Sequence, residues 1–287
     1  MEGQSQGYKR LLINPEPEWE TLSKLNGTTF LIGATNSGKS TLVQYLIRCS
    51  VRKHATIALV DSDIGQSSLG IPGTINMKIF KKSKDIETFH ADKTFFIGSL
   101  NPAKKIPLMI EGTKTLVNEA KKKSTRILVD TTGLIHGEMG IALKTGKIKS
   151  IKPDQIVALE KTDELEHILA MAHDTTVYRL KPSDSVKERS RDMRIQYRQQ
   201  RFNEYFQLKS MQEFFLNDVD LFYNGRSFSP QKQDFEKGTL IGLNHNEDTK
   251  ALGILLELDK SAVTFRSPVN SLKGINRVVF SDITIDV

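Results

Sequence analysis

The sequence predicts an α/β fold, in which a mostly parallel sheet covered by helices on both faces is followed by a small antiparallel β module. Two observations carry this prediction. Up to about residue 172, short apolar runs typical of buried strands alternate with longer helical patterns, as expected for parallel strands joined by helices. Beyond about residue 221, alternating runs are separated by turns rich in Asn, Asp, Gly and Pro, a pattern typical of antiparallel strands.

The expected elements follow in chain order. Residues 1–27 are interpreted as a lead-in segment, in which Trp19 packs against the domain. Strands are expected at 28–32, 56–60, 94–98, 126–129 and 155–159. Helices are expected at 39–52, 109–123 and 163–172. We assign 28–220 to the α/β domain and 221–287 to the β module, whose expected strands are 239–243, 251–258, 262–265, 277–280 and 283–285.

The composition narrows the class of protein. The 287 residues are 38% hydrophobic and 26% charged, which suits a soluble globular chain with a full core. The 41 Lys and Arg exceed the 34 Asp and Glu, and this formal net charge of +7 favours polyanionic partners. Cys49 is the single cysteine, so no intrachain disulfide can form. With no signal peptide and no run long enough to span a membrane, we expect a cytoplasmic protein without a membrane partner.

The most specific motif spans residues 33–41, between an expected strand and an expected helix, which is the context of a P-loop, or Walker A motif. Gly33 and Gly38 let the backbone curl so that its N–H groups point at phosphate oxygens. Lys39 is expected to reach the β- and γ-phosphates, and Ser40 to ligate Mg²⁺. The sequence therefore predicts a doubly wound P-loop NTPase that binds ATP, or another nucleoside triphosphate, through Gly33, Ala34, Thr35, Asn36, Ser37, Gly38, Lys39, Ser40 and Thr41.

Two strand ends bring carboxylates toward the phosphate site. Asp61 and Asp63 follow the strand at 56–60, where each could hold Mg²⁺ or accept a proton from an attacking hydroxyl. Asp130 follows the strand at 126–129 and offers a further carboxylate for Mg²⁺. Gln66 could orient the hydroxyl or contact the substrate. The division of metal and base roles among the aspartates stays open.

A basic segment at about 185–206 is expected to form a lid. Its cations are spaced 4, 3, 4 and 3 residues apart, so they fall on one helical face. Arg binds phosphate bidentately and neutralises charge on a transferring phosphoryl group, which favours a phosphate clamp over a solvated helix face. The stripe consists of Lys187, Arg191, Arg194, Arg198 and Arg201.

A competing motif is Leu159-Glu-Lys-Thr-Asp163, which resembles the Asn-Lys-x-Asp guanine motif of P-loop GTPases. Asp163 could accept from guanine nitrogens. Glu160, however, stands where the interaction needs an amide donor, and a carboxylate cannot donate. A GTP-dependent switch is therefore kept only as an alternative.

Together these motifs resemble the P-loop polynucleotide 5′-hydroxyl kinases related to the kinase subunit of the pre-mRNA cleavage factor and to the nucleolar pre-rRNA-processing kinase. The resemblance runs from about Trp19 to the C-terminus. Asp61–Gln66 resembles the modified Walker B motif of that family, and residues 97–102 resemble its Gly-Ser-x-x-Pro turn. The triphosphate clasp of the family matches Thr131, Thr132 and Gly133. Its arginine-bearing lid matches Arg189, Arg194 and Arg198.

The resemblance implies transfer of the γ-phosphate of ATP to the 5′-hydroxyl of RNA or DNA, with single-stranded or duplex 5′ ends as partners and RNA favoured. The implied catalytic residues are Lys39, Asp61, Asp63, Arg194 and Arg198. The implied substrate-binding residues are Gln66, Arg189 and Arg191. The implied metal ligands are Ser40, Asp61 and Asp130.

Two departures from the family are visible. The chain leaves no room for the N-terminal β domain of eukaryotic members, which suggests a compact microbial form. Leu134 stands where some relatives carry a clasp tryptophan. The alternatives are a non-catalytic ATP-binding scaffold of an RNA-processing complex and a GTPase or ATPase switch.

Overall fold

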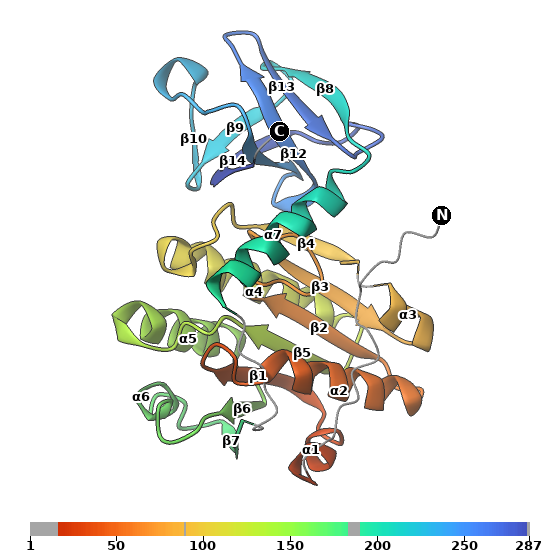
Figure 1. The fold of residues 1–287 in the computed structure, drawn as a ribbon, viewed down its shortest axis with the longest axis vertical. Coiled ribbons are helices and arrows are strands. Elements are labelled where there is room, and N and C mark those ends of the chain that lie inside the picture. Colours follow the sequence, from red (N-terminus) through yellow and green to blue (C-terminus); the bar gives the residue numbers. More distant parts are fainter. Residues whose placement is uncertain (1–16, 89, 183–189, 286–287) are drawn as a thin grey trace.

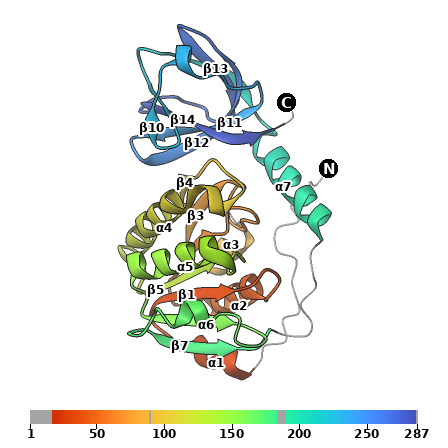
Figure 2. The ribbon, with the colours of Figure 1, turned by 90° about the vertical axis from the view of Figure 1, so that its left-hand side faces the viewer.

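The structure is a computed structural model that describes residues 17–88, 90–182 and 190–285. Two parts are stacked along its long axis, an α/β part and a β-rich part, and the C-terminal end of helix α7 (Arg191–Tyr205) lies at their junction (Figure 1). Figure 2 shows α7 running from the β-rich part down along the side of the α/β part.

Five parallel strands form the centre of the α/β part, in the spatial order β2-β5-β1-β6-β7. They are β1 (Gly27–Gly33), β2 (Ile57–Ser62), β5 (Arg126–Thr131), β6 (Gln155–Leu159) and β7 (Thr176–Leu180). Parallel neighbours end at the same edge of a sheet, so the loops after β1, β2 and β5 converge there. The predicted mostly parallel sheet is confirmed.

Two further strands extend this sheet beyond β2. Strands β3 (Thr74–Phe80) and β4 (Lys93–Phe96) are each antiparallel to the strand before them. In turn β4 meets strand β12 of the β-rich part through one pair, Thr94 with Thr249. The sheet therefore continues from one part of the molecule into the other.

Helices cover both faces of the sheet and enclose two separate cores. On one face, Leu42 and Leu46 of α2 pack with Trp19 against strand residues such as Leu31. On the other, Leu116 of α4 belongs to the second core. The first face carries α1 (Pro17–Leu22), α2 (Lys39–Arg52) and α3 (Ser83–Glu87). The second carries α4 (Ile106–Lys121), α5 (Gly137–Ile151) and α6 (Glu166–Leu169), with a 3₁₀ turn at Pro102–Lys105 before α4.

The β-rich part is mainly antiparallel, with one parallel pair between β9 and β14. Its strands are β8 (Ser210–Phe215), β9 (Asp220–Tyr223), β10 (Arg226–Ser227), β11 (Thr239–His245), β12 (Asp248–Leu258), β13 (Ala262–Ser267) and β14 (Arg277–Thr284), with a 3₁₀ turn at Pro230–Lys232. Because β8 pairs with β13, antiparallel strands begin eleven residues before the boundary expected at 221.

The end of α7 is fixed between the two parts by aromatic side chains. Phe202 and Phe206 are buried in a cluster that also contains Phe96 of β4 and Leu252 of β12. The Tyr205 hydroxyl accepts a hydrogen bond from the Leu252 N–H at 2.9 Å. The C-terminal end of α7 is therefore held by both parts at once.

Several element predictions need correction. The helix expected at 163–172 is limited to one turn, Glu166–Leu169, and the run at 283–285 begins inside β14 rather than forming a separate strand. Strands β3 and β7 and helix α5 were not predicted. Helix α5 begins with a glycine and contains two more, and it carries two inward-facing lysines, which interrupt the apolar stripe that would mark a helix in the sequence. No helix within 17–88, 90–182 or 190–285 is long and apolar enough to cross a membrane.

Candidate active site

The P-loop joins β1 to α2 with a backbone that its glycines make possible. Gly38, directly before α2, has a φ of 91°, in the left-handed region, and no side chain caps the start of the helix. A Cβ on Gly33 would lie 2.5 Å from the Leu159 carbonyl oxygen. The free N–H groups at the start of a helix form a binding site for phosphate.

The Lys39 ammonium lies folded back on the P-loop. Its Nζ donates to the carbonyl oxygens of Gly33 at 2.8 Å and Ala34 at 2.7 Å, and to Ser37 Oγ at 3.3 Å. Burial lowers the pKa of Lys39, while the charges of Asp130 and Asp63 act in the opposite direction. Phosphate oxygens are stronger partners for an ammonium than carbonyls, so this side chain suits the predicted contact with a triphosphate.

Ser40 and Asp130 form a hydroxyl–carboxylate pair beside the P-loop. Ser40 Oγ donates to Asp130 Oδ2 at 3.0 Å, and the other carboxylate oxygen accepts from the Thr131 N–H. Burial raises the pKa of Asp130 to about 7, helped by the nearby charge of Asp61. Hard oxygen ligands of this kind are those that Mg²⁺ prefers, and a divalent cation would favour the ionised carboxylate.

Asp61, which lies opposite Asp130 in the β2–β5 register, is fully occupied by its own loop. Its Oδ2 accepts from Ser67 Oγ, from the N–H and Oγ of Ser68, and from the Leu69 N–H, while Oδ1 accepts from the Asp63 N–H. Burial, followed by the charge of Asp63, raises the pKa of Asp61. This carboxylate therefore folds the loop after β2, which favours other residues for the metal and base roles.

Asp63 is half-buried and more available than Asp61. Its Oδ1 accepts from the N–H groups of Gly65 and Gln66 at 3.0 and 3.1 Å, which closes a tight turn. Within the described ranges its Oδ2 has no hydrogen-bond partner. Of the two Walker B aspartates, Asp63 thus keeps an oxygen that can accept a proton from a bound hydroxyl.

The Thr131–Gly133 turn lies directly against the P-loop. A Cβ on Gly133 would come within 2.5 Å of the Thr35 backbone nitrogen, so only glycine allows this approach. Two buried polar atoms near the site, Thr132 Oγ1 and Gln66 Oε1, have no hydrogen-bond partner among the described residues. A buried polar group left without a partner is unfavourable, so these orphaned atoms fit a site that is completed by a ligand such as ATP with Mg²⁺.

Helix α7 carries the predicted lid arginines. Ser190 caps its first turn by accepting from the Met193 N–H at 3.2 Å. Burial lowers the pKa of Arg198, and the positive charges of Arg194 and Arg191 lower it further, so three cations gather on this helix. Such a cluster suits a polyanionic ligand. Arg189 and Lys187 lie outside the described residues.

Other residues of α7 attach the helix to the loop that Asp61 folds. Tyr197 Oη donates to the Ser67 carbonyl at 2.8 Å, and Arg201 donates to the Gly70 carbonyl at 2.9 and 3.2 Å. Gln66 Nε2 approaches the Arg194 carbonyl at 3.4 Å. Arg201 thus belongs to the predicted stripe but serves to dock the lid rather than to extend its cationic face.

Comparison with known proteins places this site in a family. The family model described as "mRNA cleavage and polyadenylation factor CLP1 P-loop" matches residues 33–208, more than half of the chain. The chain belongs to the CLP1 P-loop family. The matched range contains the P-loop, the three aspartates, the clasp and α7.

Individual CLP1-family relatives agree with this assignment. The chain is 35% identical over 214 residues to "Polyribonucleotide 5'-hydroxyl-kinase PH0197" of Pyrococcus horikoshii, and 37% identical over 215 residues to "Polyribonucleotide 5'-hydroxyl-kinase MJ1315" of Methanocaldococcus jannaschii. Each match covers 71% of this chain and 58% of the relative. The chain therefore spans little more than half the length of these relatives.

The CLP1 fold is also found in a solved structure. The wild-type Clp1p–Pcf11p (454–563) complex contains a chain that superposes with a TM-score of 0.72 at 12% identity, covering 93% of this chain and 77% of that chain. At this identity the likeness shows the fold alone. It extends over both the α/β part and the β-rich part.

The guanine-motif alternative to a CLP1-type nucleotide site is not supported by the geometry. Glu160 is buried, accepts from the Leu165 N–H at 3.2 Å and pairs with Arg179 at 2.5 Å. A carboxylate tied to an arginine in this way is not available to a guanine base. The motif at 159–163 therefore acts as a structural turn after β6.

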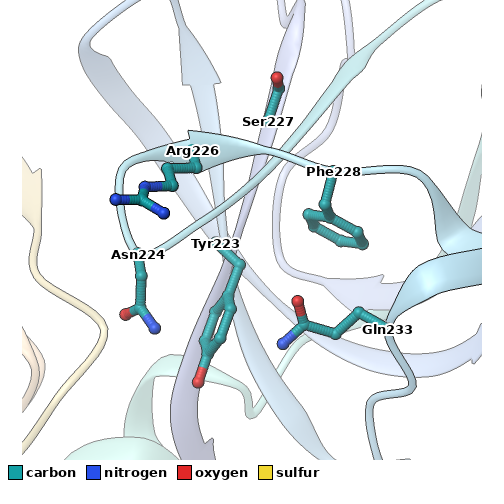
Figure 3. A pocket seen from close by; sticks show the side chains of 6 residues that line it. All are labelled: Tyr223, Asn224, Arg226, Ser227, Phe228 and Gln233. Atoms are coloured by element: carbon teal, nitrogen blue, oxygen red, sulfur yellow. The ribbon is translucent and has the colours of Figure 1, made fainter.

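A surface pocket of about 470 Å³ lies in the β-rich part, outside the CLP1-type site. None of the predicted site residues lines it. Figure 3 shows its lining residues, Tyr223, Asn224, Arg226, Ser227, Phe228 and Gln233. Among the described residues, no group of three or more His, Cys, Asp and Glu is arranged to hold a metal ion.

Two residues near the CLP1-type site were missed by sequence reasoning, Lys144 and Lys147 of α5. Both are completely buried behind the ends of β2 and β5. Lysines three apart in a helix ordinarily indicate a solvated face. The only available signal was their position on the same helical face as Gly140, Leu143 and Ile151.

Proposed function

We propose that the chain is an ATP-dependent polynucleotide 5′-hydroxyl kinase. The observation that carries this proposal is the arrangement of two carboxylates around the P-loop, one bonded to Ser40 and one with an oxygen that accepts no hydrogen bond from any described residue. A kinase needs a metal-side carboxylate and a separate acceptor for the proton of the attacking hydroxyl. Asp130 and Asp63 fit these two roles, and the archaeal relatives named above carry the matching name.

The residues divide the reaction among them. The N–H groups at the start of α2 and the Lys39 ammonium would bind the phosphates. Ser40 and Asp130 would hold Mg²⁺, which neutralises charge on the β- and γ-phosphates. Asp63 would orient the 5′-hydroxyl and accept its proton as the oxygen attacks the γ-phosphorus, while the bond from that phosphorus to the β,γ-bridging oxygen breaks and ADP leaves. Arg194 and Arg198 would stabilise the negative charge on the phosphoryl group in transfer.

The acceptor is a nucleic-acid 5′ end, single-stranded or duplex, with RNA favoured. Gln66, Arg191 and Arg189 are proposed to contact its first nucleotides, since arginine side chains bind phosphate and an amide can reach a base or ribose hydroxyl. We further propose that the protein works in the cytoplasm. The basic excess of the chain agrees with a polyanionic substrate.

The test is transfer of labelled γ-phosphate from ATP to 5′-hydroxyl RNA and DNA oligonucleotides. Wild type should label the oligonucleotide, Lys39→Ala should not, and prior phosphorylation of the 5′ end should block the reaction. The ratio of label on RNA to label on DNA would identify the preferred substrate. Binding of ATP without transfer to either oligonucleotide would contradict the proposal and point to an ATP-binding scaffold.

A further inference from the structure

Two lysines of α5 are buried, and no carboxylate of the described residues pairs with either of them at close range. The exposed fraction of Lys144 and of Lys147 is 0%. Within the ranges that the structure describes, neither ammonium has an acidic group within ion-pair distance. Burying an ammonium without a paired charge is unfavourable, and an apolar side chain of the same length would fill the space at lower cost. Packing alone therefore does not explain why lysines occupy these two positions.

Lys144 reaches the clasp. Its Nζ donates to Thr131 Oγ1 at 2.7 Å and to the Thr132 carbonyl oxygen at 2.5 Å. The Thr131 hydroxyl in turn donates a hydrogen bond to the Leu31 carbonyl oxygen at 2.8 Å. This chain of hydrogen bonds links α5 through β5 to β1, the strand that leads into the P-loop.

Lys147 makes the same kind of link one turn later. Its Nζ donates to Ser62 Oγ at 2.8 Å, and the Ser62 hydroxyl donates to the Asp130 carbonyl at 2.8 Å. Ser62 stands between Asp61 and Asp63. This second chain therefore links α5 through β2 to β5, at the residue that carries the metal-side carboxylate.

The two chains together fasten the ends of β2, β5 and β1. These three strand ends carry the proposed base, the proposed metal ligand and the phosphate loop. Reaction rates depend steeply on the spacing of such groups, because a misplacement of about 1 Å can cost about 10²-fold in rate. A link made through side-chain hydroxyls fixes this spacing more narrowly than apolar packing would.

Longer-range charge also connects the lysines to the site. Burial lowers the pKa of Lys147 to about 7, while the charges of Asp63, Asp61 and Asp130 raise it. Burial likewise lowers the pKa of Lys144, an effect that the charge of Lys147 strengthens and that of Asp63 opposes. The carboxylates of the site thus compensate part of the cost of burying both cations.

We propose that Lys144 and Lys147 are positioning residues for phosphoryl transfer, Lys144 by holding the clasp against the P-loop and Lys147 by fixing the spacing of Asp63 and Asp130. Lys144 then governs ATP affinity, and Lys147 governs the chemical step. The part that concerns Lys147 rests on the proposed function. The part that concerns Lys144 requires only that the chain binds ATP.

The experiment compares Lys144→Met and Lys147→Met with Lys149→Met, an exposed lysine of the same helix. Dissociation constants for ATP without added metal, kcat, KM for ATP and Tm are measured for each. Lys144→Met should raise the ATP dissociation constant about tenfold or more, and Lys147→Met should lower kcat by about tenfold or more with KM for ATP within about twofold. Lys149→Met should match wild type in all four quantities.

Smaller changes test whether each lysine acts through its hydroxyl. Ser62→Ala should lower kcat on its own and add little to Lys147→Met, and Thr131→Val should stand in the same relation to Lys144→Met for ATP affinity. If a lysine variant fails to fold, Ser62→Ala and Thr131→Val still test the same two hydrogen-bond chains. Unchanged ATP affinity and kcat in both hydroxyl variants would overturn the proposal, as would fully additive effects. If wild type binds ATP but transfers nothing, the proposed function fails while the Lys144 and Thr131 affinities still decide their part.

Discussion

Helix α2, which follows the P-loop, and helix α5 lie on opposite faces of the sheet, and both direct lysines toward the same strand ends, but in different ways. Lys39 of α2 lies on the ligand side and contacts carbonyls of its own loop, five and six residues away. Lys144 and Lys147 lie on the protein side and contact residues 12 to 85 positions away. Only the contacts of Lys39 join residues close enough in the sequence to be recognised from a short motif. A site can thus have a face that sequence motifs describe and a supporting face that they do not.

The largest effect should come from the ligand-side lysine. Lys39→Met removes the ammonium that is expected to follow the γ-phosphoryl group, so kcat/KM for phosphate transfer should fall by at least about 10²–10³-fold. In the same transfer assay, Lys147→Met should lower kcat/KM by a smaller factor than Lys39→Met. An equal or larger loss for Lys147→Met would break the distinction between the two faces.

Separate roles for Asp63 and Asp130 predict separate kinetic signatures. Asp63→Asn cannot accept the hydroxyl proton, so kcat should fall by about 10²–10⁴-fold while the affinity for ATP stays near that of wild type. Asp130→Asn should instead raise the Mg²⁺ concentration at half-maximal rate. Titration of Mg²⁺ in transfer assays distinguishes the two. If Asp63→Asn shifted the Mg²⁺ requirement and Asp130→Asn did not, the roles assigned here would have to be exchanged.

Asp61 belongs to the supporting face despite its place in the motif. Asp61→Asn replaces an acceptor of five hydrogen bonds with an amide whose nitrogen cannot accept any of them. The free energy of unfolding should fall by about 3 kcal/mol, because buried donors lose their partner. Urea denaturation measures this. Asp63→Asn, which disturbs only two turn N–H groups, is the control and should lose much less stability.

The smallest effects separate two arginines of one helix. Arg198→Ala should weaken RNA binding and reduce its salt dependence, because a cation of the cluster is lost. Arg201→Ala removes the bonds to the Gly70 carbonyl, so it should lower the free energy of unfolding by about 1 kcal/mol and leave the salt dependence nearly unchanged. RNA affinity measured at several salt concentrations checks both. If RNA affinity depended on salt concentration equally in both variants, the assignment of Arg198 to phosphate binding and of Arg201 to holding the helix would be wrong.

The parts of the site that sequence could predict are those set by neighbouring residues. The P-loop, the helix at 39–52 and the strand ends bearing Asp61 and Asp130 follow from short-range pattern. The choice between Asp61 and Asp63 did not, because it depends on how the loop at 63–69 folds back onto one carboxylate. Helix α5 was missed because its lysines read as polar positions, and their burial depends on hydroxyls that the sheet brings together.

The fold shows the same division. Parallel strands with apolar runs were recognised, whereas β7 was missed because most of its residues are exposed or half-buried as the outermost strand of the parallel series. Strand β8 was also missed, since only Phe214 of its six residues is buried. Edge strands bury few side chains, so their sequences resemble those of loops.

The aromatic anchor fixes the C-terminal end of α7, so a tilt of the helix about it has to carry along or break the hydrogen bond from Tyr197 to the Ser67 carbonyl. Phe202 and Phe206 hold one end between the two parts of the molecule, and Arg191 stands at the other. Eleven residues of helix separate Phe202 from Arg191, a length of about 16 Å at 1.5 Å per residue. A tilt of about 10° about the anchored end therefore moves the arginine end by about 3 Å, enough to make or release a phosphate contact. A small rotation at the junction with the β-rich part would therefore produce a larger displacement at the arginine end of α7 than at its anchored end.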